Sequence, residues 1–80
     1  MDYRELGQAF AELRRERGFS QQQIADGVGI SRATINAFET GRAGDVGLKK
    51  VLRLADYLGY ELCIRPASPF PTLEELVREL

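Results

Sequence analysis

The chain has 80 residues, a formal net charge of −1 at pH 7, no histidine and one cysteine. This length allows one small domain, whose core is marginally stable alone, and Cys63 has no second cysteine for an intrachain disulfide. We therefore expect dimerisation. Because no run of ~20 apolar residues occurs and MDYREL lacks the charged-then-apolar pattern of a signal peptide, we expect a cytoplasmic protein that does not span a membrane.

The composition also argues against catalysis. Histidine, the usual general base and a common metal ligand, is absent. No glycine-rich loop precedes a Lys-Ser or Lys-Thr pair, so the sequence does not predict a phosphate-binding loop. Cys63 falls on a predicted strand without a base partner. We expect a non-enzymatic protein with no metal site and no cofactor.

Apolar residues at helical spacing predict a first helix over residues 3–17. They are Tyr3, Leu6, Phe10 and Leu13. Asp2 can cap the start of this helix, Gly18 ends it, and Phe19 should then enter the core. A cluster of three arginines in the last turn suits the helix dipole. It is either a solvated helix end or a set of phosphate contacts, and it consists of Arg14, Arg15 and Arg17.

Residues 20–42 predict two short helices, over 21–27 and 31–40, joined by a tight turn at Gly29. Ser20 and Ser31 are suitable N-caps, and Gln23 can complete a capping box with Ser20. Gly29 can adopt the positive φ that a sharp turn requires. Gly27 is costly inside a helix and suggests that the first of the two ends early. The expected core residues are Ile24, Val28, Ile30, Ile35 and Phe38, with the small Ala25 at the helix crossing.

The second of these helices has a small, polar outer face. This face carries Arg32, Ala33, Asn36 and Ala37. A short helix with such a face fits the DNA major groove. The overall charge and the pI of about 5.4 argue mildly against nucleic acid, but five arginines lie in or just before the 20–42 segment, whereas four glutamates lie in the last third of the chain. The arginines are Arg14, Arg15, Arg17, Arg32 and Arg42, and the glutamates are Glu61, Glu74, Glu75 and Glu79. We expect modest, salt-sensitive DNA binding.

A loop and a further helix follow, over residues 43–47 and 47–58. Asp45 is the expected N-cap. The predicted apolar stripe contains Leu48, Val51, Leu52, Ala55 and Leu58, widened by Leu54. Three basic residues lie on the other side, where we expect them to face solvent: Lys49, Lys50 and Arg53. Lys49 or Lys50 could alternatively reach a phosphate.

Alternating apolar residues then predict a short strand over residues 60–66, ended by Pro66. A lone strand cannot satisfy its backbone groups. No second strand candidate exists in the sequence, so we expect the same strand of a second copy to pair with it as an antiparallel ribbon. The expected dimerisation residues are Tyr60, Leu62, Cys63 and Ile64. Cys63 is expected to pack as a small residue rather than to meet its mate.

Two prolines make residues 67–71 a stiff linker, and Thr72 can cap a last helix. The apolar stripe of that helix consists of Leu73, Leu76, Val77 and Leu80. It either folds back on its own dimer or docks on another protein. We thus predict a mainly α protein of about five helices and one short strand, organised as a helical domain (1–59), a dimerisation strand (60–66) and a linker with a terminal helix (67–80).

Several spaced residues of the 20–42 segment resemble the helix-turn-helix of lambda-repressor-like, or XRE, DNA-binding regulators. They are Ser20-Gln21, Ile24-Ala25, Gly29, Ser31-Arg32, Thr34-Ile35, Phe38-Glu39 and Gly41-Arg42. The resemblance covers about residues 6–58. It implies a homodimeric repressor of operator DNA. It implies base readout by Ser31, Arg32, Ala33, Asn36 and Ala37, with phosphate contacts from Gln21, Thr34 and Arg42.

Residues 48–66 resemble the HipB-like antitoxin branch of that family, in which a C-terminal strand pairs between subunits. This likeness implies a HipA-like Ser/Thr kinase toxin as partner and autoregulation of the shared operon. The proline linker and acidic last helix are a departure from the branch. Two alternatives remain: a free-standing repressor of the phage or restriction-modification type, and a toxin inhibitor that binds DNA weakly, which the acidic pI favours.

Overall fold

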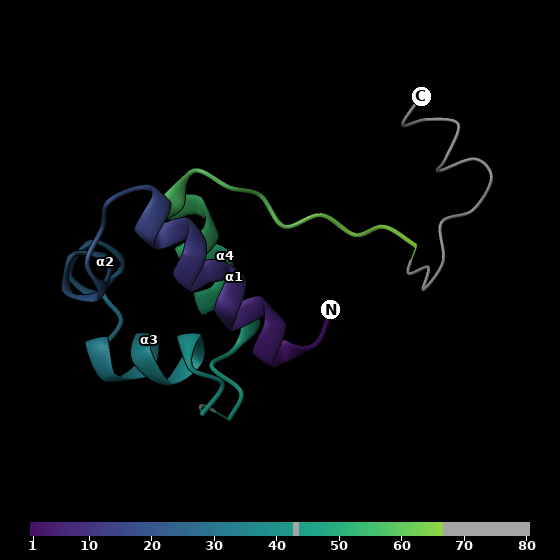
Figure 1. Ribbon diagram of the computed structural model, residues 1–80, viewed down its shortest axis with the longest axis horizontal. Coiled ribbons are helices and arrows are strands. Elements are labelled where there is room, and N and C mark those ends of the chain that lie inside the picture. Colours follow the sequence, from purple (N-terminus) through teal and green to yellow (C-terminus); the bar gives the residue numbers. More distant parts are fainter. Residues whose placement is uncertain (43, 67–80) are drawn as a thin grey trace.

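Four helices form the regular structure of residues 1–42 and 44–66, which the computed structural model describes (Figure 1). They are α1 (Tyr3–Glu16), α2 (Gln21–Val28), α3 (Arg32–Glu39) and α4 (Leu48–Leu58). α3 packs against α1 and α2, and α4 packs against the same two helices. These bounds confirm the first four predicted helices. The predicted linker and fifth helix, with Leu73, Leu76, Val77 and Leu80, lie outside the described residues.

Local side-chain chemistry sets the ends of α2 and α3. The Ser20 hydroxyl accepts a hydrogen bond from the Gln23 N–H at 3.0 Å, and the Gln23 side-chain oxygen accepts from the Ser20 N–H at 2.7 Å. This is the predicted capping box. Gly29 ends α2 with φ 77°, a left-handed conformation that glycine adopts without steric cost. Ser31 then caps α3 by accepting from the backbone N–H of residue 34 at 3.1 Å.

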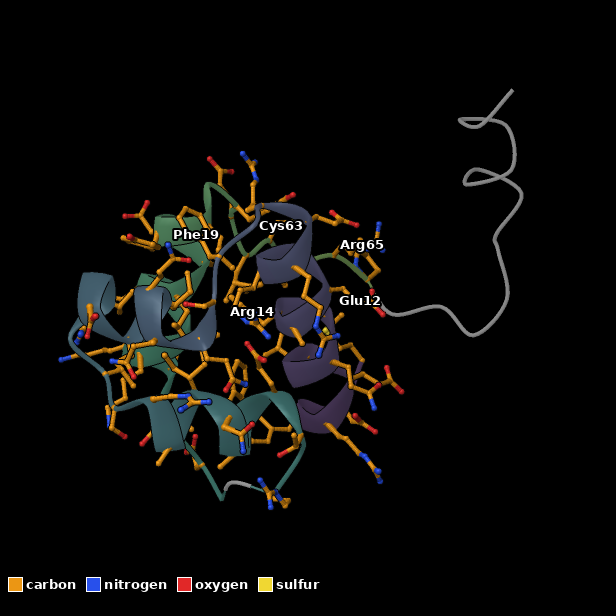
Figure 2. All side chains as sticks on the ribbon, turned by 60° about the vertical axis from the view of Figure 1, so that its left-hand side comes forward. Glu12, Arg14, Phe19, Cys63 and Arg65 are labelled. Carbon is orange, nitrogen blue, oxygen red and sulfur yellow. The ribbon has the colours of Figure 1, made fainter. Side chains whose placement is uncertain are left out.

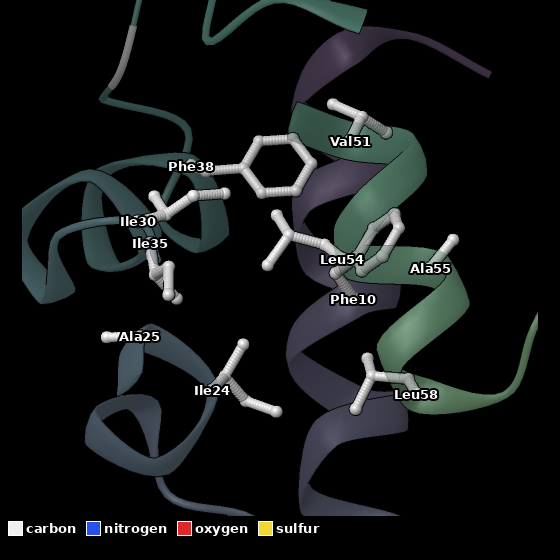
Figure 3. Close-up of a cluster of buried hydrophobic side chains, with 10 residues drawn as sticks. All are labelled: Phe10, Ile24, Ala25, Ile30, Ile35, Phe38, Val51, Leu54, Ala55 and Leu58. Carbon is white, nitrogen blue, oxygen red and sulfur yellow. The ribbon is translucent and has the colours of Figure 1, made fainter. Parts of the chain in front are cut away.

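One apolar core joins the four helices (Figure 3). Its members are Phe10, Ile24, Ala25, Ile30, Ile35, Phe38, Val51, Leu54, Ala55 and Leu58. Phe38 lies at its centre, only 1% exposed, with its ring centroid 5.5 Å from that of Tyr3 and 5.4 Å from that of Phe10. Burial of one phenylalanine side chain contributes about 1.5–3 kcal/mol. Phe38 is therefore one of the side chains that hold α3 to α1.

Two glycines allow helices to approach one another closely. A Cβ at Gly7 would collide with the backbone carbonyl of Phe38, so α1 and α3 touch backbone to backbone there. A Cβ at Gly27 would collide with the ring of Tyr57, which packs on α2 from α4. The expectation that Gly27 ends α2 early is wrong, because α2 continues to Val28. The glycine makes room for an aromatic ring.

The start of α4 differs from the prediction. Gly47, not Asp45, is its N-cap, and no side chain caps it. The Asp45 carboxylate instead accepts from the Gly47 N–H at 2.8 Å within the loop. Leu48 and Leu52 are 67% and 46% exposed, so their place in the buried stripe is also wrong. The buried stripe of α4 consists of Val51, Leu54, Ala55 and Leu58. Leu48 and Leu52 lie outside it because the apolar residues of α4 span more of the helix circumference than α1 and α2 cover.

Residues 60–66 form no strand within the described chain. The Tyr60 N–H closes the end of α4 by donating to the Ala55 carbonyl at 2.9 Å. The segment then runs away from the helices (Figure 1), and the Ile64 side chain is fully exposed. Cys63 and Arg65 lie on this segment (Figure 2), and the Cys63 thiol is free and exposed. A strand needs a pairing partner, and α1 to α4 present none, so pairing across a dimer stays a prediction.

Gly7→Ala tests the contact between α1 and α3. A better helix former would by itself stabilise α1 by about 1 kcal/mol. Overpacking against the Phe38 carbonyl should outweigh this gain and leave a net loss of about 1–2 kcal/mol. Gly44→Ala is the matched control because open space surrounds that position; it should stay within about 0.5 kcal/mol of the parent. Equal melting temperatures for the two variants in circular dichroism would contradict the contact.

Candidate nucleic-acid interface

The first turn of α3 is the exposed end of that helix. Ser31, Arg32 and Ala33 are exposed, whereas Ile35, Phe38 and Glu39 face the core. The remaining predicted contact residues are half-buried at its flanks: Thr34, Asn36 and Ala37. The predicted base-reading residues are thus brought together on one short helix. Its N-terminal side chains and its capped, positively polarised end face outward.

A buried ion pair joins α1 to α3. Arg14 donates from Nε to Glu39 Oε2 at 2.8 Å and from Nη2 to Oε1 at 2.9 Å. Its third donor, Nη1, reaches the Phe19 carbonyl at 2.8 Å. Both side chains are buried, with 10% and 5% of their surface exposed, and the hydrogen bond to Glu39 raises the pKa of the Arg14 guanidinium. The expectation that Arg14 is solvated or contacts phosphate is therefore wrong.

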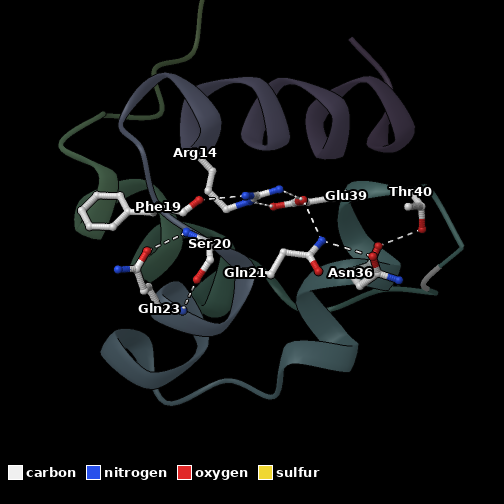
Figure 4. A network of polar contacts seen from close by, with 8 residues as sticks. All are labelled: Arg14, Phe19, Ser20, Gln21, Gln23, Asn36, Glu39 and Thr40. Carbon is white, nitrogen blue, oxygen red and sulfur yellow. Dashed lines mark hydrogen bonds and ion pairs between the residues drawn. The ribbon is translucent and has the colours of Figure 1, made fainter.

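The ion pair continues to the surface through Gln21 (Figure 4). The Gln21 amide nitrogen donates to Glu39 Oε1 at 3.0 Å and to Asn36 Oδ1 at 3.1 Å. We call this set of four side chains, Arg14, Glu39, Gln21 and Asn36, the polar network. It ties the start of α2 to the middle of α3. The Gln21 amide nitrogen is already occupied, so a phosphate contact by this residue would come from its backbone N–H in the first turn of α2.

The other predicted phosphate contacts lie at the two ends of α3. The Thr34 hydroxyl is 2.8 Å from the Ser31 hydroxyl. Arg42 is exposed and donates from Nε to the Thr40 hydroxyl at 3.0 Å. Arg32 is also exposed, and within residues 1–42 and 44–66 its guanidinium makes no hydrogen bond or ion pair. Positive charge is therefore available at the start of α3, from Arg32, and just past its end, from Arg42, where side chains of a groove-bound helix can contact phosphates.

Sequence reasoning missed the partner of Arg14. One pattern pointed to it: Arg14 follows Phe10 by four residues, and Glu39 follows Ile35 by four, so each charge lies on an apolar stripe. Opposite charges on the buried faces of two packed helices suggest an ion pair. The contact of Arg53 was also missed: its guanidinium donates a hydrogen bond to the carbonyl of Val28 at the end of α2.

In the part of the chain that the structure describes, no three histidine, cysteine or carboxylate side chains gather as metal ligands would. None of the helices α1 to α4 combines the length and the apolar character needed to cross a bilayer.

A short capped helix, a left-handed glycine turn and a second helix exposed at its start define a helix-turn-helix. Residues 5–63 match the family model described as a helix-turn-helix domain, and the chain belongs to this family. It is 36% identical over 54 residues to the SPbeta prophage-derived uncharacterized HTH-type transcriptional regulator YonR of Bacillus subtilis strain 168. That match covers 68% of this chain and 49% of the relative, so the chain spans about half the relative's length.

Glu39→Ala tests the buried ion pair. The substitution leaves the Arg14 cation buried without a counter-charge and should cost roughly 3–5 kcal/mol of unfolding free energy. The double variant Arg14→Met with Glu39→Leu removes both charges and should recover most of this loss. Urea unfolding followed by circular dichroism measures both.

Glu12→Ala is the control, because that carboxylate is exposed on α1 and its loss should change stability by under about 0.5 kcal/mol. If Glu39→Ala cost no more than this control, the ion pair would contribute nothing to the fold.

Proposed function

We propose that this protein is a sequence-specific DNA-binding transcriptional repressor. The observation that carries the proposal is the exposed first turn of α3, fixed against α1 and α2 by the polar network. A rigid helix is needed because base readout depends on placing donors and acceptors to within a hydrogen-bond length. The helix-turn-helix family match and the relative named as a transcriptional regulator support it.

α3 would enter the major groove with its N-terminal residues at the base edges. Arg32 would donate two hydrogen bonds to guanine O6 and N7, and Ala33 would contact a thymine methyl group. Ser31 and Ala37 flank these two on the same helix, and Ala37 adds little discrimination because it is short. Arg42 and the backbone N–H groups at the start of α2 would hold phosphates and set the register.

We further propose that residues 60–66 pair with their copy in a homodimer. Two observations support this pairing. Ile64 is fully exposed and Leu62 is 41% exposed, and the backbone groups of residues 61–66 have no hydrogen-bond partners within the described chain. Such an edge is a template for pairing with another strand. In a repressor dimer the two α3 helices would lie one DNA turn apart, about 34–36 Å.

The regulated operon has two candidate types. The resemblance of residues 48–66 to HipB-like antitoxins supports an autoregulated operon that also encodes a HipA-like kinase toxin. The prophage origin in the relative's name supports a free-standing phage-type repressor instead. In both cases this chain acts by binding and not by catalysis. Co-purification with the product of an adjacent kinase-like gene would favour the antitoxin.

Fluorescence anisotropy tests the DNA-binding proposal directly. The protein is titrated against DNA from upstream of its own gene and against scrambled DNA, at two salt concentrations. Tighter binding to the upstream fragment that weakens with salt is expected, because bound phosphates release counterions. Equal, weak binding to both fragments would contradict autoregulation and favour a protein-binding inhibitor.

Arg32→Ala should weaken binding to the preferred site by roughly 1–3 kcal/mol and relax the base preference at one position. Arg32→Lys keeps the charge but loses the planar fork that matches guanine. It should retain affinity for scrambled DNA and lose discrimination. The same anisotropy titration measures both, and unchanged discrimination in Arg32→Ala would rule out base readout by this residue.

Ile64→Asp should shift the protein from dimer to monomer, because it places a charge in the apolar face of the proposed ribbon. Glu61→Gln is the control, since Glu61 lies on the opposite face of the alternating segment. Analytical ultracentrifugation at micromolar concentration measures the mass of each variant. A parent protein that is already monomeric there would contradict the ribbon.

A further inference from the structure

The polar network transmits a fixed hydrogen-bond direction from the core to the surface. A guanidinium only donates and an ionised carboxylate only accepts. Because Arg14 donates to both oxygens of Glu39, the Glu39 side chain is held as an acceptor. Gln21 must therefore turn its NH2 group, and not its oxygen, toward Glu39, as it does at 3.0 Å.

The same NH2 group also faces Asn36. An amide nitrogen carries two hydrogens, and Gln21 uses one for Glu39 and one for Asn36 Oδ1. Asn36 must then direct its oxygen toward Gln21. Its own NH2 group is left on the opposite side, away from Gln21 (Figure 4). Asn36 is half-buried on α3, beside the exposed first turn.

We propose that Asn36 acts on DNA as a hydrogen-bond donor only, and that Gln21 is the positioning residue that imposes this. The inference rests on the proposed function. Asparagine recognises adenine through two bonds, one of which needs its oxygen as acceptor. With that oxygen directed at Gln21, the amide does not present its oxygen and its NH2 group together to one base, so Asn36 does not read adenine. It contacts an acceptor: guanine O6 or N7, thymine O4, or a phosphate oxygen.

Selection of bound sites from a randomised duplex library tests this. The parent protein, Asn36→Ala and Gln21→Ala are compared, with Gln22→Ala as the matched control. Gln22 is the next residue of α2, is exposed, and bonds to Asp26 outside the network. Circular dichroism establishes that each variant is folded. Asn36→Ala keeps the Arg14–Glu39 pair and so tests the contact even if Gln21→Ala fails to fold.

If the acceptor is on a base, Asn36→Ala loses a guanine or thymine preference at one position. In that case Gln21→Ala frees the Asn36 amide to rotate, and the preference for adenine at that position rises by roughly fivefold or more. If the acceptor is a phosphate, Asn36→Ala weakens all sites by one common factor, and the salt dependence stays that of the parent because the lost donor carries no charge. Gln22→Ala keeps the parent preference in both cases.

Two results would overturn the inference while leaving the proposed function intact. One is an adenine preference in the parent that Asn36→Ala removes. The other is an Asn36→Ala variant whose site preference, affinity and salt dependence match those of the parent. Failure of the parent to enrich any sequence is a third, distinct result, and it would overturn the proposed function itself together with the inference.

Discussion

The buried ion pair between Arg14 and Glu39 is the constraint on which the arrangement of the first three helices depends. Removing two charges from water costs several kcal/mol each, and their attraction recovers this only with good geometry. Here Arg14 donates hydrogen bonds to both oxygens of the Glu39 carboxylate and to the Phe19 carbonyl. An apolar pair of similar volume would tolerate small shifts of α3. The ion pair does not, because a shift would leave a buried charge poorly bonded. Its main contribution is therefore to the placement of α3.

Apolar packing acts beside this pair on the same helix. Phe38 precedes Glu39 and lies at the centre of the core, where Gly7 allows the α1 backbone to touch that of α3. α3 has only eight residues, and three of them face inward: Ile35, Phe38 and Glu39. Few side chains are left for DNA, and several of them are small. The same anchoring that makes the helix rigid thus limits how many bases one copy can read, which makes a paired second copy valuable to a repressor.

Local signals predicted most of the fold. The Ser20 capping box and the Gly29 turn depend on residues three or four apart, and both are present in the structure. Contacts distant in sequence were not predictable in the same way. Gly27 lies inside α2 where the Tyr57 ring of α4 leaves no room for a Cβ, and the exposure of Leu48 depends on how far the neighbouring helices extend. In the site, helical spacing placed the exposed first turn of α3 correctly. The polar network escaped prediction because it joins three separate elements.

The last turn of α1 connects the two surfaces that the proposed repressor needs. Arg14 holds Glu39 and thereby α3. One turn further on, the Arg17 guanidinium lies 5.0 Å from the centre of the Tyr60 ring, a cation–π distance, at the point where residues 60–66 leave the helices. α3 and the start of the segment proposed to pair with a second copy thus both contact the C-terminal end of α1. In a dimer built through that segment, the distance between the two α3 helices would therefore depend on the direction in which the chain leaves α4 at Tyr60, where Arg17 contacts it.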